Sequence, residues 1–333
     1  MRLKYLDVLK TIGIIGVVVI HSSAPLIDKS IVGSHIWWVG NVFDSLFRIS
    51  VPLLFMVSGA LLLEKKDVGL KNFYMKRLSP LMFAFVVWSV IYFVHRNIDY
   101  PQSFTLNILV RSIISGDIYG RLWFFYTIIG LYLVTPFLRV FVKNAKYEEL
   151  NLYLILWFAT TVGSGFFNHF YNLNIAFNLT FVNGYIGYFI LGYYLRISEY
   201  QIKNTKLGPL LLLLNTITVV GTFFLSNSGG ENNLYFYNNL SPNVILTSVL
   251  VFIFIKSNVK GTSGVFEKEI GNNSLGIYVI HSLVMIWLSR RGIDSFILSP
   301  SISVILLTIL TFTISFLLSK LIKSIPIVKF ILP

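Results

Sequence analysis

The chain has 333 residues, of which 55% are hydrophobic and 12% charged, and its formal net charge is +13. Soluble domains carry about 25% charged residues, so this composition excludes an ordinary soluble protein. The absence of cysteine excludes disulfides, thiolate metal sites and a cysteine nucleophile. We expect no metal site and no permanently bound cofactor.

Apolar runs recur along the chain at about the length that spans a membrane. They cover residues 8–27, 47–63, 79–95, 122–142, 150–167, 181–197, 209–226, 243–257, 274–289 and 301–322. The second and the eighth are short, which leaves room for tilted or partly re-entrant segments. The sequence therefore predicts an all-α, polytopic membrane helix bundle of about ten transmembrane helices. We expect a single integral-membrane domain over residues 1–333, with no separate soluble domain.

The basic residues are distributed unequally between the loops on the two sides of the predicted membrane. When successive loops are assigned to alternate sides, most of the 27 Lys and Arg residues fall on the side of the N-terminus. This bias follows the positive-inside rule and predicts that both termini are cytosolic. No single element concentrates the basic residues into a stripe, so the expected partner is the lipid bilayer and not a nucleic acid.

Two ionisable residues, Lys10 and His21, lie eleven residues apart in and beside the first apolar run. In a helix this spacing is almost three turns, so the side chains share one face about 16 Å apart along the axis. Ionisable residues inside a membrane are functional-site hypotheses by default. For His21 the alternatives are a packed, hydrogen-bonded histidine and a general base. For Lys10 they are a snorkelling lysine paired with Asp7 and a cation that holds donor phosphates.

Carboxylates are not expected in the middle of any span, which makes histidine the group available for proton transfer within the membrane. An orienting partner for His21 is expected among three acidic residues of the outer loops, Asp28, Asp44 and Asp117.

Two further groups of polar residues carry the same ambiguity. Lys76 and Arg77 precede the third run and are explained either by topology or by phosphate binding. Ser274, Tyr278 and His281 follow helical spacing in the ninth run and form a polar stripe. Such a stripe faces the bundle interior or water, either as packing contacts or as substrate contacts.

Five short segments fit one pattern in chain order. They are YLDVLK at 5–10 with the downstream His21, RISVPLLFMVSG at 48–59, KRLSP at 76–80, LWFFY at 122–126 with YLVTP at 132–136, and SLGIYVIH at 274–281. Together these segments resemble the acyltransferase-3 family of integral-membrane acyl transferases, over nearly the whole chain.

The resemblance implies transfer of an acyl group, most often acetyl, from cytosolic acyl-CoA as cosubstrate to a carbohydrate outside, with His21 as the catalytic histidine. The chain is most similar to the stand-alone members of the family, which act on surface polysaccharides, and we expect it in the bacterial plasma membrane. Two departures bear on donor binding. Lys10 stands where the family usually has Arg, which loses a bidentate fork for phosphate, and Arg121 precedes Leu122-Trp123 where some members have His.

The resemblance and the residue pattern together predict a vectorial reaction, in which the acyl group passes from a donor on one side of the membrane to an acceptor on the other. Acyl-CoA is expected to dock against Lys10, Lys76 and Arg77, with its thioester reaching His21, which acts as a general base or as a covalent acyl carrier. Further substrate or oxyanion contacts are expected among Arg48, Arg121, Trp123, Tyr126, Ser274, Tyr278 and His281. The acceptor is a surface polysaccharide or its lipid-linked precursor.

Two other functions remain open from the sequence. The first is a transporter or flippase for a polysaccharide precursor, in which His21 and His281 contact the substrate or protons. The second is a membrane-embedded sensing or binding module attached to a partner enzyme. A transporter would neither bind nor cleave acyl-CoA, and activity of the isolated chain would argue against the second.

Overall fold

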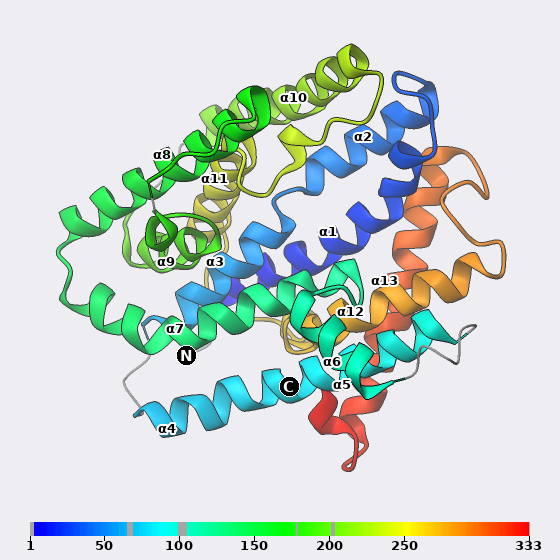
Figure 1. Cartoon of the computed structure of the whole chain (residues 1–333). Coiled ribbons are helices and arrows are strands. Elements are labelled where there is room, and N and C mark those ends of the chain that lie inside the picture. The colour runs from blue at the N-terminus through cyan, green and yellow to red at the C-terminus, as the bar shows by residue number, and fades with distance from the viewer. Residues whose placement is uncertain (1–2, 65–68, 99–104, 178, 201–203, 333) are drawn as a thin grey trace.

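The computed structural model describes residues 3–64, 69–98, 105–177, 179–200 and 204–332, and its regular elements there are all helices (Figure 1). Within the described residues, eight helical stretches are long and apolar enough to cross a membrane. The predicted all-α, polytopic bundle is confirmed. The two predicted runs outside these eight stretches, 181–197 and 274–289, fall in the short helix α9 and in α12.

Helix α1 lies inside the bundle and packs against α2, α3, α11, α12 and α13 (Figure 1). The principal helices are α1 (Lys4–Asp28), α2 (His35–Phe47), α3 (Ser50–Leu62), α5 (Ser79–Asn97), α7 (Trp123–Asn144), α8 (Tyr147–Tyr171), α9 (Tyr185–Ile197), α10 (Asn204–Gly229), α11 (Pro242–Asn258), α12 (Val265–Ser289) and α13 (Pro300–Ser324). The shorter elements are α4 (Leu70–Phe73), η1 (Tyr74–Leu78), α6 (Leu106–Ser115), η3 (Gly120–Leu122), η4 (Thr180–Val182), η5 (Tyr235–Tyr237) and η6 (Lys329–Ile331). We call the end of the bundle at Lys4 the inner end and the end at Asp28 the outer end.

Glycines set the closest approaches between the central helices. Gly16 of α1 lies directly against Ser50, and a side chain at this position would overlap the Ser50 hydroxyl. Gly59 of α3 and Gly192 of α9 each face the backbone of the opposite helix. Because lipid gives little hydrophobic drive for helix association, small residues that allow close packing stabilise such contacts. These contacts hold α1, α3 and α9 in fixed register.

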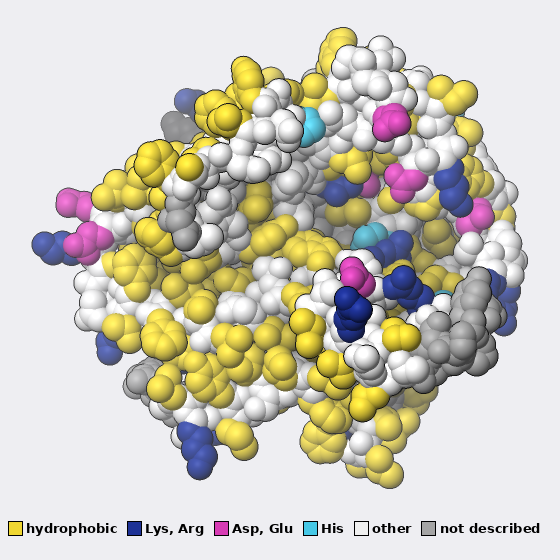
Figure 2. Space-filling view, in the orientation of Figure 1, with side chains coloured by type: hydrophobic (Ala, Val, Ile, Leu, Met, Phe, Trp, Pro, Cys, Tyr) yellow, Lys and Arg dark blue, Asp and Glu magenta, His cyan; other side chains and the backbone are white. Residues whose placement is uncertain are grey.

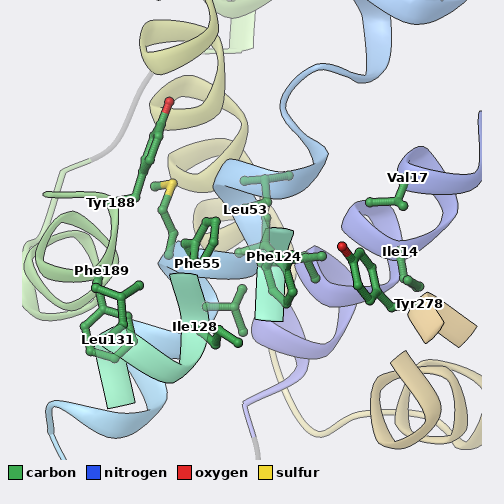
Figure 3. Close-up of a cluster of buried hydrophobic side chains, with 14 of the residues drawn as sticks. Ile14, Val17, Leu53, Phe55, Phe124, Ile128, Leu131, Tyr188, Phe189 and Tyr278 are labelled. Atoms are coloured by element: carbon green, nitrogen blue, oxygen red, sulfur yellow. The ribbon is translucent and has the colours of Figure 1, made fainter. Parts of the chain in front are cut away.

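Large apolar side chains fill the space that α1, α3, α7, α9 and α12 enclose (Figure 3). Leu53 and Phe55 are fully buried, and the Phe55 ring lies 4.8 Å from the ring of Phe124. Phe124 in turn lies 4.9 Å from the ring of Tyr278, which Figure 3 shows beside Ile14 of α1. The core therefore continues up to the polar stripe of α12 and holds it against α1.

Residues 35–47 form helix α2, so the predicted start of the second run at residue 47 and the placement of Asp44 in an outer loop were wrong. Ser34 caps the helix, because its hydroxyl accepts a hydrogen bond from the Trp37 backbone N–H at 3.2 Å. Asn41 and Asp44 interrupt the hydropathy of this segment, which is why the apolar run appeared to begin only at residue 47. With α3, the helix forms one spanning stretch, His35–Leu62.

The break between α2 and α3 has a cause in the sequence. Pro52 has no backbone N–H, so it cannot bond the carbonyl four residues earlier, at Arg48. The helical path is interrupted at Arg48 and Ile49 and resumes at Ser50, whose hydroxyl donates to the Phe47 carbonyl at 2.6 Å. The break places Arg48 at the joint of the two helices.

Basic residues at the inner end cap helices. Arg139 donates to the carbonyl of Leu62 and Arg196 donates to the carbonyl of Ala60, both at 2.7 Å and both at the end of α3. Lys256 donates to three carbonyl oxygens at the end of α9 and just beyond it. Cations at helix C-termini satisfy free carbonyls and oppose the helix dipole. Part of the inner basic charge is therefore structural.

Candidate active site

A cavity of about 600 Å³ lies toward the inner end of the bundle. Four cationic side chains line it, Lys10 of α1, Lys76 and Arg77 of η1, and Lys323 of α13, and none of the described lining residues is acidic. The structure thus brings together all three residues that the sequence predicted for donor binding. Clustered cations without carboxylates suit the phosphates of an anionic ligand.

Lys76 and Arg77 lie in a widened π-helical turn directly before α5. Pro80, near the start of α5, cannot donate to the carbonyl of the preceding turn, and a π-turn accommodates such an interruption. Both basic side chains are exposed, on a segment whose helical geometry is locally altered. π-turns of this kind are frequent at functional sites.

Lys323 is a member of the inner cavity that the sequence did not single out. It lies in the last turn of α13, and its Nζ donates to the carbonyl of Asn272 at 2.7 Å. A basic residue in a helix turn at the inner end of the bundle is expected from the positive-inside rule alone. Its participation became visible only from the packing of α13 on α12.

A second cavity of about 260 Å³ lies at the outer end and is lined by His21. Its charged lining residues are Lys29, Arg121, Arg290 and Asp294. Figure 2 shows a hollow on one face of the molecule, in which basic, acidic and histidine side chains gather among hydrophobic ones. Unlike the inner cavity, the outer cavity combines cations with a carboxylate and an imidazole.

His21 and His281 stack on each other, with ring centroids 5.2 Å apart and an angle of 17° between the planes. The sequence singled out both residues but did not predict that α1 and α12 bring them into contact. His281 is fully buried, whereas His21 is partly accessible from the outer cavity.

Hydrogen bonds determine the tautomer that a neutral His281 adopts. Its Nδ1 lies against the carbonyl of Tyr278, which can only accept, so Nδ1 carries the proton. Its Nε2 then accepts from the hydroxyl of Ser282 at 3.1 Å, and that hydroxyl accepts from the Arg121 guanidinium at 3.1 Å. Both nitrogens of His281 are therefore occupied in a neutral imidazole.

His21 differs from His281 in this respect. Among the residues that the structure describes, neither ring nitrogen of His21 has a hydrogen-bond partner. The expected orienting carboxylate among Asp28, Asp44 and Asp117 does not bond it, and that prediction was wrong. The ring is positioned instead by stacking on His281, and its nitrogens are available to a ligand in the outer cavity.

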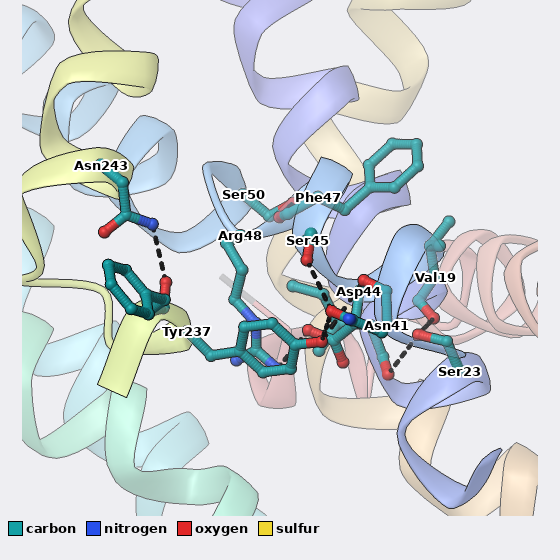
Figure 4. Close-up of polar contacts among 12 residues, drawn as sticks. Val19, Ser23, Asn41, Asp44, Ser45, Phe47, Arg48, Ser50, Tyr237 and Asn243 are labelled. Carbon is teal, nitrogen blue, oxygen red and sulfur yellow. Dashed lines mark hydrogen bonds and ion pairs between the residues drawn. The ribbon is translucent and has the colours of Figure 1, made fainter. Parts of the chain in front are cut away.

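The carboxylate of Asp44 is buried within a spanning stretch, so the prediction of no acidic group there was also wrong. Asp44 pairs with Arg48 one turn later, and the Arg48 guanidinium lies 4.2 Å from the centre of the Tyr237 ring (Figure 4). The Tyr237 hydroxyl bonds the amide oxygen of Asn41. This cluster ties α2 to η5. The guanidinium of Arg48, a predicted oxyanion contact, is bound within the cluster by Asp44 and Tyr237.

The polar stripe of α12 leads from the inner cavity to the stacked histidines. Ser274 and Tyr278 line the inner cavity, and the next member of the stripe is His281. The Tyr278 hydroxyl donates to the backbone carbonyl of Arg121, which holds the ring across the bundle. A layer of Tyr278, His281 and His21 therefore separates the inner cavity from the outer one.

The two aromatic candidates of α7 lie elsewhere. Trp123 packs 5.3 Å from the ring of Tyr185, and the Tyr126 hydroxyl donates to the carbonyl of Ile113 at 2.6 Å. Neither belongs to the lining of the inner or the outer cavity. Their contacts hold α7 against α9 and α6, so the structure gives them packing roles.

A comparison with protein-family models gives one match, to a model described as an acyltransferase domain, over residues 3–320. The matched range contains every residue of the inner cavity except Lys323, and every residue of the outer cavity. No curated protein matches the chain, and no solved structure does.

Proposed function

The chain belongs to the acyltransferase-3 family and is a multi-pass membrane acyltransferase, and from this premise we propose its substrates. The donor is cytosolic acyl-CoA, with acetyl as the first candidate for the acyl group. The acceptor is a hydroxyl of a surface polysaccharide, or of its lipid-linked precursor, outside a bacterial plasma membrane. This combination makes the enzyme an O-acyltransferase that acts across the membrane.

The observation that carries the proposal is the pair of cavities at opposite ends of the bundle. The inner cavity is cationic and reaches Tyr278, the outer one contains the accessible His21, and His281, one turn beyond Tyr278 on α12, stacks on His21. A donor that enters from one side and an acceptor that enters from the other would meet at His21.

Size and charge of the inner cavity suit the donor. Its volume, about 600 Å³, lies within the usual range for small-molecule sites. Its cations would hold the CoA phosphates near the inner end, where Lys10 lies about 16 Å from His21 along the helix axis. This separation is comparable to the pantetheine arm. The thioester reaches His21 when the Tyr278 ring moves aside, because that ring lies between the cavity and His281.

His21 would serve as general base. The acceptor hydroxyl gives its proton to a ring nitrogen of His21 while its oxygen attacks the carbonyl carbon of the thioester. A carbon–oxygen bond forms, the carbon–sulfur bond breaks, and the departing CoA thiolate takes the proton from His21. Arg121, which lines the outer cavity, is the cation suited to stabilise the negative charge on the carbonyl oxygen.

The test is the O-acyl content of the surface polysaccharide by NMR in three strains: wild type, a deletion, and His21→Ala at a matched membrane level. Loss of the acyl signals in both altered strains supports the transferase. A lower amount of polymer with normally acylated repeats would instead support a transporter.

A second experiment separates the two roles considered for His21, general base and covalent acyl carrier. It is mass spectrometry of the purified enzyme with acyl-CoA alone, because only a covalent carrier gains the mass of the acyl group.

A further inference from the structure

A third cavity, of about 370 Å³, lies at the outer end, bordered by the C-terminal half of α8, the segment before α9, and η5. Its polar and aromatic lining includes Ser164, Asn168, His169, Asn183, Tyr235 and Asn238. None of its described lining residues is Lys, Arg, Asp or Glu. The reaction described above uses none of these residues.

The polar groups of this cavity are held in place before any ligand arrives. The amide nitrogen of Asn183 donates to the Ser164 hydroxyl at 3.2 Å, and its amide oxygen accepts from the Thr161 hydroxyl at 3.1 Å. On another wall, the rings of His169 and Tyr235 lie 4.8 Å apart. The cavity thus offers fixed amides and hydroxyls together with an aromatic surface.

We propose that this cavity binds a neutral saccharide. A charged ligand would lose its hydration without gaining a counter-charge, and an apolar ligand would displace water from the amides and hydroxyls of the lining without offering them hydrogen bonds. A sugar ring has hydroxyls for the amides and C–H faces for the rings of His169 and Tyr235. The chemistry of the lining therefore selects an uncharged, polyhydroxylated ligand.

The same loop that lines the cavity also reaches the outer end of α1. Tyr235 lines the cavity, whereas Tyr237, two residues later, bonds Asn41 and lies under Arg48. Asn232 of this loop donates to the carbonyl of Ile27 in α1 at 2.9 Å. The role that we give to this cavity rests on the proposed function. In that role, the cavity holds sugar units of the acceptor while another unit of the same acceptor occupies the site at His21.

Two glycines of α8 provide a matched test. Gly165 lines the cavity and Gly163 does not, and a Cβ at either position would meet no atom within 4 Å. Residues two apart in a helix point about 200° apart, so the two positions face different surroundings. Gly165→Leu adds a side chain at the cavity wall, with free space around its Cβ, whereas Gly163→Leu makes the same change outside the cavity lining. Both raise helix propensity, so neither is expected to unfold α8.

The experiment is calorimetric titration of the purified full chain with maltoheptaose, with chitohexaose as a second neutral probe and oligogalacturonate as an anionic one. We expect wild type to bind a neutral probe and not the anionic one. We expect Gly165→Leu to weaken binding by about tenfold or more, and Gly163→Leu to leave it unchanged. Asn183→Leu, which removes the hydrogen bonds at similar volume, serves as a second variant and should weaken binding as well.

The inference is overturned if wild type binds no neutral probe, if it prefers the anionic one, or if Gly163→Leu and Gly165→Leu bind equally. These outcomes are independent of the proposed reaction, because no acyl donor is present. If the chain binds a neutral oligosaccharide but never cleaves acyl-CoA, the proposed function fails and the saccharide site stands.

Discussion

The cavities at the two ends of the bundle use their cations differently. In the inner cavity, the charged lining residues among those described are all cationic, Lys10, Lys76, Arg77 and Lys323, so the lining attracts an anionic ligand. In the outer cavity, Arg121 and two other cations share the lining with an acidic residue and with His21. The inner end is therefore suited to hold phosphates, and the outer end to hold an uncharged hydroxyl next to an imidazole.

The stacked histidines show the same division of roles at close range. His281 has both nitrogens hydrogen-bonded and is closed off from both cavities, so it cannot take a proton without breaking a contact. His21 has open nitrogens and a cavity beside them. The comparison assigns proton transfer to His21 and the positioning of its ring to His281.

The largest effect is expected from His21→Ala. Loss of a general base costs roughly 100- to 10,000-fold in rate, so acyl transfer should fall by at least about 100-fold. The measurement is release of CoA thiol by purified enzyme with acyl-CoA and an acceptor oligosaccharide. The control is His35→Ala, at an exposed histidine at the start of α2, which should keep wild-type activity. Equal rates for the two variants would contradict the role of His21.

A smaller effect is expected at the inner end. Arg77→Ala removes one charge-assisted contact and should raise the KM for acyl-CoA about tenfold, with little change in kcat. If the lost contact is to the 3′-phosphate of CoA, the preference for acyl-CoA over acyl-dephospho-CoA should shrink in the variant. The control is Lys143→Ala, at an exposed lysine outside the cavity lining. A reduced kcat with unchanged KM would place Arg77 outside the donor site.

A third effect sharpens the distinction between the two histidines. Ser282→Ala removes the hydroxyl that bonds Nε2 of His281, and the lost hydrogen bond, about 1 kcal/mol, should lower kcat roughly fivefold. The KM for acyl-CoA should not change, because Ser282 does not line the inner cavity. Ser282→Thr should restore the rate, since it restores the hydroxyl. A loss that Thr does not rescue would indicate a packing defect instead of a positioning role.

The sequence was sufficient to predict the helical bundle and three of the four cations of the inner cavity, Lys10, Lys76 and Arg77, but not Lys323. The spacing of Lys10 and His21 on one helix was predictable, because it depends on local geometry alone. The stacking of His21 on His281 was not, because it requires the packing of α1 against α12.

The buried pair at the joint of α2 and α3 shows the limit of hydropathy more clearly. Asp44 and Asn41 lowered the hydropathy of residues 35–47 enough to suggest a loop. The signals that could have revealed the helix were the Ser34 cap and the four-residue spacing of Asp44 and Arg48, which suits an ion pair on one helix face. Whether such a pair is buried depends on tertiary contacts, here on Tyr237.

The smallest effect separates structural cations from ligand-binding ones at the same end of the bundle. Lys256→Met removes three hydrogen bonds to carbonyl oxygens at the end of α9 and just beyond it, at a cost of about 1 kcal/mol in the free energy of unfolding. Thermal unfolding in detergent should show a lower Tm, and the KM for acyl-CoA should stay at the wild-type value, because Lys256 does not line the inner cavity. Arg77→Ala should show the reverse, a raised KM with an unchanged Tm. If both variants change the same quantity, the division of inner basic residues into helix caps and donor contacts is wrong.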